Sequence, residues 1–437
     1  MNHVTRRSGL YALLVGLFVA CGFAGATDTD WPQWGGPNRN FTVDTSGLAD
    51  QWPPGGPRKL WHRTLGDGYS SIVAHGDMLY TMCRKGPDYT QEYTVCLDAK
   101  TGKTIWEQGH PAPPGSAPDY SSWGGGGPNS TPLIVGERLF TLGSRTMMHC
   151  RSRTTGDVLW KHDLEAEYRG TSSGNSEGYS PSPIAYKNLV IVLIGHLKHN
   201  QERKGQSLVA FDQESGRVVW KSQDFVAGAS SPILINFAGK EQIVLLVADQ
   251  LLGINPADGR LLWRYDYPMR YRTMIVTPVW NGDDLIFCRA GAQAAEGTST
   301  VRLTERDGRI IPEELWTSTK LSIFVPTPVH IGDHLYGAVE QGLVAIDFKT
   351  GERKWVQRRF PNAACIHADG KLIILDENGK LTLTTATPEE LTVLAQDTVT
   401  ERYSYSVPTL VGTTLYVRDR RHIMALDLGK PGGSMRD

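Results

Sequence analysis

Residues 94–106 read Thr94-Val95-Cys96-Leu97-Asp98-Ala99-Lys100-Thr101-Gly102-Lys103-Thr104-Ile105-Trp106, which is an apolar strand, a polar turn that ends on Gly, and a second strand that ends on Trp. The same offsets return in three later segments, at 209–220, 253–263 and 344–355. A unit that recurs along the chain in this way predicts a repeat architecture.

The turn of this unit has a recognisable chemistry. Asp98 can accept hydrogen bonds from the backbone amides that follow it, and Gly102 can adopt the positive φ that closes a tight hairpin. A tryptophan follows four residues after the glycine, and an aromatic side chain of this kind buries about 150–250 Å². We therefore expect one tryptophan per repeat to pack as a wedge between neighbouring sheets. These docking residues are Trp61, Trp106, Trp160, Trp220, Trp263, Trp316 and Trp355.

A second periodic signal marks where each repeat begins. Typically, a Ser or Thr followed by Pro opens an apolar strand, a turn residue comes four residues after the Pro, and Leu or Val comes seven after it. The position of the Pro in this pattern occurs eight times, at 72, 132, 183, 232, 278, 328, 365 and 408, and it is not Pro at 72 and 365. Each anchor starts one β-hairpin and each Gly-to-Trp unit ends another, so every repeat holds about four strands, as a β-propeller blade does.

The two ends of the repeat region complement each other. The last repeat stops at Asp427-Leu428 without a Gly-to-Trp unit, whereas residues 59–65 form a lone Trp-bearing strand. Pairing these strands closes the ring and removes a free sheet edge. The sequence therefore predicts an all-β fold, an eight-bladed β-propeller of four-stranded blades closed by an N-terminal strand. Seven blades is the alternative, because the seventh repeat lacks its tryptophan.

The chain before the ring divides into two parts. Residues 1–26 resemble a signal peptide, with Arg6 and Arg7 before an apolar run and Ala24-Gly25-Ala26 as a cleavage site, so we expect an exported protein, periplasmic or extracellular. Phe18-Val19-Ala20-Cys21 resembles a lipobox, so a lipid anchor at Cys21 and plain cleavage both stay open. Residues 27–58 are expected to wrap the outside of the propeller, which spans 59–428 and is followed by a tail, 429–437.

Charge and cysteine content narrow the class of protein. Lys plus Arg number 45 against 46 acidic residues, so the chain has no excess of positive charge for binding nucleic acid. Beyond residues 1–26, no stretch is long and apolar enough to span a membrane. Five cysteines lie beyond Cys21 without metal-ligand spacing. Packed free thiols are the favoured interpretation, and a disulfide between Cys83 and Cys96 is the alternative.

The extension opens with Trp31-Pro32-Gln33-Trp34, too rich in Gly and Pro afterwards for a regular element. If its indoles merely cover outer surface, Trp31→Ala should destabilise the fold much less than Trp220→Ala or Trp263→Ala, for which we expect about 3–5 kcal/mol.

Loop lengths suggest where a ligand would bind. The turns inside the first hairpins and the Asp-to-Gly turns are short, and strand alternation puts both on one rim. Long connections, such as 107–128 and 161–179, fall on the opposite rim, and loops carry binding residues more often than strands do. Tyr and Arg are favoured at recognition surfaces, although ordinary packing is the alternative for each. The candidate binding face comprises Tyr69, Trp123, Tyr179, Arg270, Arg272, Tyr403, Tyr405 and Arg418.

No catalytic constellation is evident in the sequence. The carboxylates expected on the loop-rich rim are scattered, and there is no G-x-S-x-G, no H-E-x-x-H and no phosphate loop. His196 and His199 have no further matched ligands nearby. We assign no catalytic, cofactor-binding or metal-binding residue.

The Asp-x-x-Thr-Gly-x-x-x-Trp unit of 98–106, repeated at 347–355 and, with Ser for Thr, at 212–220, resembles the tryptophan-docking motif of pyrroloquinoline-quinone-like (PQQ-like) propeller repeats. The resemblance covers about residues 59–428 and implies one of two classes. One class holds non-enzymatic binding propellers such as the outer-membrane assembly lipoprotein, and the other holds quinoprotein alcohol dehydrogenases, with PQQ and calcium in the channel. Those enzymes usually carry a disulfide between adjacent cysteines that stacks on the quinone, which this chain lacks. The resemblance therefore favours an exported, non-catalytic scaffold for protein partners of the cell envelope, without cofactor. The quinoprotein enzyme is the alternative.

Overall fold

The structure of the protein is a computed structural model. It describes residues 30–86, 89–113, 127–168, 178–195, 205–226, 228–266, 275–289, 297–318, 321, 326–339, 342–401 and 404–430. The expectations for the signal peptide, for Cys21, for His196 and His199, and for the tail beyond residue 430 fall outside these residues.

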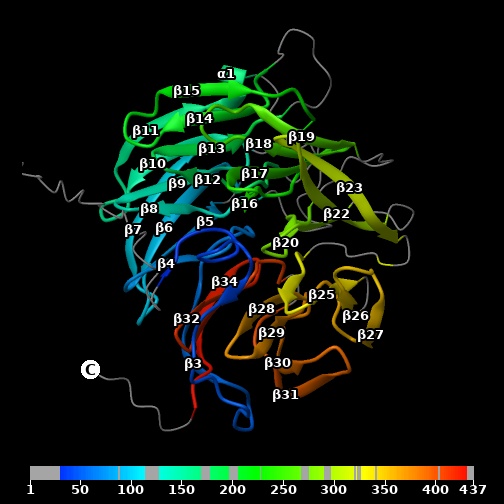
Figure 1. The fold of residues 1–437 in the computed structure, drawn as a ribbon. Coiled ribbons are helices and arrows are strands. Elements are labelled where there is room, and N and C mark those ends of the chain that lie inside the picture. The colour runs from blue at the N-terminus through cyan, green and yellow to red at the C-terminus, as the bar shows by residue number, and fades with distance from the viewer. Residues whose placement is uncertain are drawn as a thin grey trace, which may run out of the picture.

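The described chain folds into eight sheets arranged in a ring, each built on four antiparallel strands (Figure 1). Blade 1 holds β4 (Val73–His75), β5 (Met78–Lys85), β6 (Gln91–Asp98) and β7 (Thr104–Pro111); blade 2 holds β8 (Leu133–Val135), β9 (Arg138–Leu142), β10 (Met147–Ser152) and β11 (Val158–Asp163). Blade 3 holds β12 (Ile184–Tyr186), β13 (Leu189–Leu193), β14 (Leu208–Asp212) and β15 (Val218–Ser222); blade 4 holds β16 (Ile233–Phe237), β17 (Lys240–Val247), β18 (Gln250–Ile254) and β19 (Leu261–Asp266).

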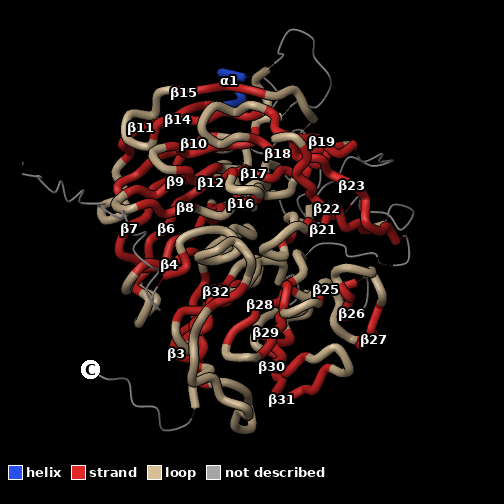
Figure 2. The backbone as a smooth tube through the Cα atoms, in the orientation of Figure 1, coloured by secondary structure: helices blue, strands red, loops and turns tan. Residues whose placement is uncertain are grey.

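The second half of the ring repeats this order. Blade 5 holds β20 (Val279–Trp280), β21 (Leu285–Arg289), β22 (Thr298–Arg306) and β23 (Arg309–Ser318); blade 6 holds β24 (Val329–Ile331), β25 (His334–Val339), β26 (Gly342–Asp347) and β27 (Arg353–Arg358). Blade 7 holds β28 (Ala364–Ala368), β29 (Lys371–Leu375), β30 (Lys380–Ala386) and β31 (Leu391–Thr398). Blade 8 holds β32 (Thr409–Val411), β33 (Thr414–Arg418), β34 (His422–Asp427) and the early strand β3 (Arg58–Thr64). Figure 2 shows how completely strands dominate, with the short helix α1 (Leu164–Tyr168) at the edge.

The ring closes as the sequence predicts. Strand β3 pairs antiparallel with β34, from Arg58 opposite Asp427 to Thr64 opposite His422. Blade 7 has four strands even though its outer strand lacks a tryptophan. The prediction of an eight-bladed all-β propeller is therefore confirmed, and the seven-bladed alternative is wrong.

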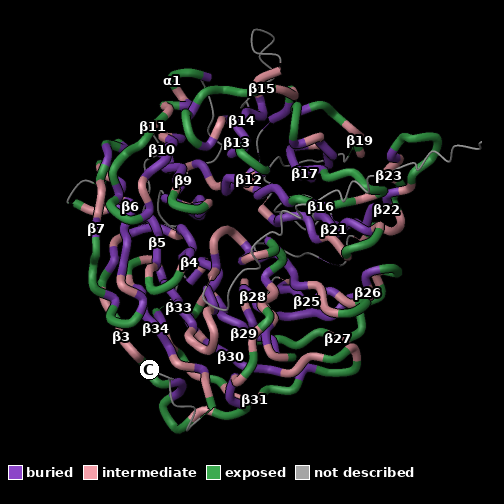
Figure 3. The backbone as a smooth tube through the Cα atoms, turned by 60° about the vertical axis from the view of Figure 1, so that its left-hand side comes forward, coloured by how far each residue is buried: buried purple, intermediate pink, exposed green. Residues whose placement is uncertain are grey.

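The first strand of each blade lies at the centre of the ring. First strands of neighbouring blades contact one another, as β4 does β8 and β24 does β28. Buried residues concentrate on the strands around the centre, whereas exposed residues mark the outer strands (Figure 3). The apolar runs of the inner strands are thus explained by burial between two neighbouring blades.

The repeated turn forms through the contacts that its residues favour. Asp98 accepts a hydrogen bond from the Thr101 amide at 2.8 Å, and Gly102 has a φ of +68°. A Cβ atom on Gly102 would lie 2.5 Å from the Trp61 ring of the preceding blade. The glycine is therefore needed twice, for its backbone conformation and for the close approach of the indole.

Six of the docking tryptophans donate their indole N–H to a carbonyl of the next blade's turn, at 2.9–3.2 Å. The pairs are Trp61 with Ala99, Trp106 with Arg153, Trp160 with Gln213, Trp220 with Pro256, Trp316 with Phe348, and Trp355 with Thr387. These bonds join neighbouring blades at six of the eight junctions of the ring.

Trp263 makes a different contact. Its indole donates to Gln242 of its own blade and packs over Gly253, where a Cβ atom would lie 2.0 Å from Nε1. In the next blade, β22 and β23 extend to nine and ten residues and are joined by the two-residue turn Asp307-Gly308, so the longer repeated turn is not formed there. Trp263 still lies in the apolar core shared by blades 4 and 5.

The N-terminal segment lies inside the ring, so the expectation that it wraps the outside is wrong for residues 30–48. Strand β1 (Asp30–Trp31) pairs with β4, and β2 (Thr42–Val43) pairs with β28, in each case on the channel side of the first strand. Between them, Trp34 Nε1 donates to Thr277 Oγ1 of blade 5 at 3.0 Å. This segment appears in dark blue at the centre of Figure 1, beside β4. We call residues 30–48 the channel segment.

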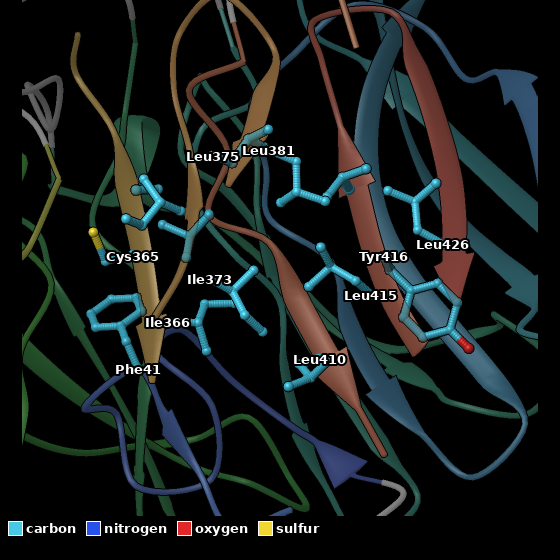
Figure 4. Packing of buried hydrophobic residues seen from close by; sticks show 14 of the residues in the cluster. Phe41, Cys365, Ile366, Ile373, Leu375, Leu381, Leu410, Leu415, Tyr416 and Leu426 are labelled. Carbon is cyan, nitrogen blue, oxygen red and sulfur yellow. The ribbon is translucent and has the colours of Figure 1, made fainter. Parts of the chain in front are cut away.

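The channel segment enters and leaves on one side. Asp30 lies opposite His75 at the turn after β4, and Leu48 donates its amide to Asp369 in the turn after β28. Phe41 packs beside Ile366 in the core of blades 7 and 8 (Figure 4). A short segment can bury Trp31 and Phe41 here because an eight-bladed ring leaves its central channel open to residues from elsewhere in the chain.

Candidate binding face at the channel mouth

The two rims of the ring differ in what reaches them. The turns that follow the inner strands, and the turns that carry the repeated Asp and Gly, face the side where the channel segment enters; we call it the tight-turn rim. The residues that lead into the inner strands face the other side, the loop-rich rim. Candidate binding residues that the structure describes are Tyr69, Tyr179, Tyr405 and Arg418. Trp123, Arg270, Arg272 and Tyr403 lie outside the described residues.

Two of the candidates meet at the loop-rich end of the channel. The rings of Tyr69 and Tyr405 lie with centroids 5.5 Å apart, although 335 residues separate them in the chain. Tyr405 donates its hydroxyl to Glu377 at 3.1 Å, and Asn362 donates to the same carboxylate oxygen at 2.9 Å. The Tyr69 hydroxyl is buried without a partner among the described residues, and burial raises its pKa.

A charged pair lies beside these tyrosines. Arg420 Nε donates to both oxygens of Asp67, at 2.7 and 2.8 Å. The hydrogen bond that Arg420 donates to Asp67 raises the pKa of Arg420, which therefore stays charged. Tyr69, Tyr405, Glu377, Asp67 and Arg420 together form what we call the mouth cluster, drawn from blades 7, 8 and 1. Asp67 is buried, whereas the other four residues are partly exposed, so the cluster presents aromatic rings and charged groups that suit polar recognition more than chemistry.

Asp67 and Glu377 are members that sequence reasoning missed. Each lies in a connecting segment, Asp67 between two glycines and Glu377 directly after Asp376, and nothing in the local sequence differs from a solvated turn. Their partners lie 353 residues away for Asp67 and 28 for Glu377. Only the closed ring brings these groups together.

Arg418 does not belong to a binding face. Its side chain is 1% exposed, and the guanidinium donates to the carbonyls of Gly68, Ser70 and Met82 at 2.6–2.9 Å. These acceptors belong to blade 1 and the segment before it, so Arg418 fastens the last blade to the first. Burial lowers its pKa, and the carbonyl dipoles compensate the buried charge.

Tyr179 is likewise a core residue. It is 1% exposed, and its hydroxyl donates to Leu193 O at 2.8 Å within the apolar cluster of blades 2 and 3. The sequence could not separate this tyrosine from Tyr69, because both precede an inner strand. The difference arises from which neighbouring side chains cover each ring.

A buried polar cluster between blades 1 and 2 also escaped the sequence analysis. Arg84 Nη2 donates to Glu92 Oε1 at 2.6 Å, and the Ser144 amide donates to Glu92 Oε2 at 3.0 Å. His110 Nε2 lies 3.8 Å from the same carboxylate, and its ring lies 4.8 Å from that of His149. The Ser144 hydroxyl also bonds to Glu92. Because that carboxylate already pairs with Arg84, the group resembles a buried structural network more than a nucleophile and its base.

Two features of the described residues bear on the quinone site that the family resemblance offers as an alternative, namely the inner strand edges and the cysteines. The inner edges of β4 and β28 are occupied by β1 and β2. The five described cysteines are buried and free, and they are spread over four blades. Cys96 lies opposite Tyr80 and Cys83 opposite Tyr93, so the Cys83–Cys96 disulfide is wrong. Burial raises the pKa of Cys83 to about 11, which keeps this thiol protonated at neutral pH.

The described part of the chain holds no group of three or more His, Cys, Asp or Glu arranged to bind a metal ion. Among its helices, none is long and apolar enough to span a membrane.

Comparison with solved structures shows the fold. A computationally designed protein, Ika8, superimposes with a TM-score of 0.54 at 9% identity, over 87% of this chain and all of that one. BamB from Moraxella catarrhalis matches with a TM-score of 0.40 and 13% identity, over 87% of this chain and 99% of that one. A europium-containing methanol dehydrogenase matches with a TM-score of 0.47 and 12% identity, over 90% of this chain and 89% of that one. Of these three, the Ika8 match has a TM-score above 0.5, and at 9% identity it supports the fold alone.

Comparison with sequences shows the family. No curated protein matches the chain. A family model described as outer membrane protein assembly factor BamB matches residues 91–357, which is more than half of the 437 residues. The match runs from β6 to β27 and so includes most of the repeated turns. The resemblance inferred from those turns is confirmed, and the chain belongs to the PQQ-like β-propeller family of the outer-membrane protein assembly factor BamB.

Proposed function

We propose that the protein is an exported, non-catalytic propeller that binds a protein partner of the cell envelope through its loop-rich rim. The observation that carries this proposal is the channel segment. It covers the inner edges of blades 1 and 7 and enters from the tight-turn rim. The opposite rim, with the long connections and the mouth cluster, is left as the face for a partner.

The family and the chemistry of the mouth support the same role. The matching family is described as an assembly factor of the outer membrane, which fits a partner in the envelope. Tyr69, Tyr405 and Arg420 are of the types that dominate protein interfaces, where rigid aromatic rings and guanidinium groups contribute most of the binding energy. The balanced net charge of −1 favours a partner recognised by shape and local polar contacts.

Export and anchoring belong to the proposal as well. Export would place the ring outside the cytoplasm. The exported chain then either loses its signal peptide by plain cleavage or carries a lipid on Cys21. Lipidation is testable by mass spectrometry of the mature N-terminus, since an acylated Cys21 and a start after Ala26 differ in mass and sequence. We assign no quinone and no calcium, and the quinoprotein alcohol dehydrogenase is the alternative against which the proposal is tested.

Site-specific photo-crosslinking in living cells tests the partner. A crosslinking amino acid at Tyr89 or Glu401, both exposed on the loop-rich side, should capture a defined envelope protein. The matched control is Lys187, exposed in the tight turn after β12, which should capture none. Equal capture from Lys187, or none from either loop-rich position, would contradict the proposal.

A second experiment addresses the enzyme alternative. The purified protein is mixed with PQQ and calcium, and dye-linked alcohol oxidation is recorded together with quinone absorbance. We expect neither stoichiometric uptake nor turnover. Uptake with turnover would establish the quinoprotein class instead.

A further inference from the structure

The channel segment carries a buried cation. Arg39 is 5% exposed; its Nε donates to Pro232 O at 2.9 Å, and its Nη1 donates to Pro183 O and to Gln33 Oε1, each at 3.0 Å. The third nitrogen, Nη2, is buried and has no acceptor among the described residues. Burial lowers the pKa of Arg39 to about 9, so the group is still charged at neutral pH.

This arrangement is costly for a structural residue. Buried charges in proteins are normally paired with an opposite charge, because desolvation is not repaid otherwise. The described residues supply Arg39 with two carbonyls and an amide oxygen, and none of its bonds goes to a carboxylate. Arg39 also has a φ of +55°, a left-handed conformation that costs a non-glycine residue about 1 kcal/mol or more. Strain of this kind is typical of functional positions.

Arg39 lies at the loop-rich end of the channel. Its acceptors Pro183 and Pro232 come directly before β12 and β16, and the inner strands begin on the loop-rich side. The channel segment enters from the tight-turn rim and turns back here, so Arg39 stands near its tip. The guanidinium is therefore buried at the loop-rich end of the channel segment.

Further unpartnered donors occupy corresponding positions in the two blades that precede those bound by Arg39. The hydroxyls of Ser71, Ser130 and Thr131 are buried without partners among the described residues. All three come just before inner strands of blades 1 and 2. Thr131 donates its amide to Ser182 Oγ at 3.0 Å, and Ser182 adjoins the Pro183 that binds Arg39. These positions thus supply free hydrogen-bond donors. Arg39 supplies a cation that contacts no carboxylate among the described residues.

We propose that the loop-rich end of the channel binds a carboxylate group, with Nη2 of Arg39 as its cation and the hydroxyls of Ser71, Ser130 and Thr131 as further donors. A carboxylate is the matching acceptor because charge-assisted bonds to guanidinium are the strongest that such a site can form. Only one nitrogen of Arg39 is free, so the contact is end-on, and the second carboxylate oxygen is left for the hydroxyls. The inference rests on the proposed function and deepens it, since it names the group that a ligand or partner inserts.

Binding of acetate tests the site on the purified protein without any partner. Acetate replaces chloride at constant ionic strength, and the thermal unfolding midpoint is recorded. A ligand at 100 times its Kd should raise the midpoint of a chain of this length by about 3 °C. Arg39→Gln should abolish the shift. The matched control is Thr277→Val, which removes the hydrogen bond of Trp34 but keeps the cation, and it should preserve the shift.

Two peptides distinguish the source of the carboxylate. Triglycine offers a chain-end carboxylate, and triglycinamide is the same peptide without it. A response to acetate and triglycine, but not to the amide, supports a site for chain ends; a response to acetate alone supports a site for small free carboxylates. These arms use the wild-type protein, so they decide even if Arg39→Gln fails to fold.

Three results would overturn the inference: no response to either carboxylate, an equal response to triglycinamide, or loss of the response in Thr277→Val as well as in Arg39→Gln. The last result would mean that acetate reports docking of the channel segment. Failure of the crosslinking experiment with a positive acetate response would refute the protein partner while leaving the site intact.

Discussion

Replacing Trp31 by alanine tests whether the channel segment is part of the folded core. Trp31 is 2% exposed, pairs with Ala74 of β4, and lies over Gly36, where a Cβ atom would be 3.4 Å from the indole. The sequence alone led us to expect a small effect, because an indole on the outside of a ring loses little when truncated. The structure reverses that expectation.

The magnitude follows from the buried surface. A tryptophan that buries roughly 200 Å² contributes up to about 5 kcal/mol at 25 cal/mol per Å², and measured truncations of buried aromatic residues cost about 3–5 kcal/mol. At about 2.1 cal/mol/K of unfolding entropy per residue, a chain of 437 residues has about 0.9 kcal/mol/K. A loss of 4 kcal/mol therefore lowers the unfolding midpoint by about 4 °C.

Far-UV circular dichroism during guanidinium and thermal unfolding measures this loss without relying on tryptophan fluorescence, which twelve indoles share. Ile105→Ala is the matched control, because that side chain is 49% exposed on an outer strand and should change the free energy of unfolding by less than about 0.5 kcal/mol. A Trp31→Ala loss as small as that of the control would refute the placement of residues 30–48 in the channel.

Three further predictions concern the ring itself. Gly216→Ala should lower the free energy of unfolding by about 2–3 kcal/mol in chemical denaturation, because φ is +72° and a Cβ atom would lie 2.7 Å from Trp160. The control Gly136→Ala has a φ of +53° but open space around the Cβ position, so it should cost only about 1 kcal/mol. Equal losses would argue against the indole stacking. Burial lowers the pKa of His149 to about 3, so the unfolded chain binds a proton that the folded chain does not, and stability should fall by about 1.4 kcal/mol per pH unit as the pH drops from about 6.5 toward 3. His149→Asn should reduce that slope by the same amount in denaturation curves across this range, and an unchanged slope would contradict the assignment. Arg418→Met should cost about 3 kcal/mol by removing the guanidinium hydrogen bonds to three buried carbonyls, of which only Ser70 O keeps a second donor among the described residues, the Thr81 hydroxyl. A neutral outcome would show that the ring does not depend on these bonds between its last and first blades.

Blade architecture was predictable because its signals are local. The carboxylate of Asp98 accepts hydrogen bonds from the turn that its own neighbours make, and Gly102 takes the conformation that the turn requires. These interactions join residues a few positions apart, so the sequence displays them directly. Repetition then supplies the number of blades, and the lone strand at 59–65 supplies the closure.

The candidate site was predictable only in part. The sequence placed Tyr69 and Tyr405 on the same rim, and the structure brings them together. It could not tell that Arg418 and Tyr179 are buried, because a residue before or after a strand carries no mark of what covers it. Nor could it show the pairing of Arg84 with Glu92 beneath Ser144, where the decisive contact crosses from one blade to the next.

By itself, the sequence determined that this protein is an eight-bladed ring, because turn chemistry and periodic burial act over a few residues and repeat along the chain. Only the tertiary structure decided what fills the ring. Whether residues 30–48 lie outside or inside depends on the width of the channel and on acceptors such as Pro183 and Pro232, which lie up to 193 positions from Arg39. Burial of Trp31 and Arg39 is a property of the assembled blades, and no local pattern encodes it.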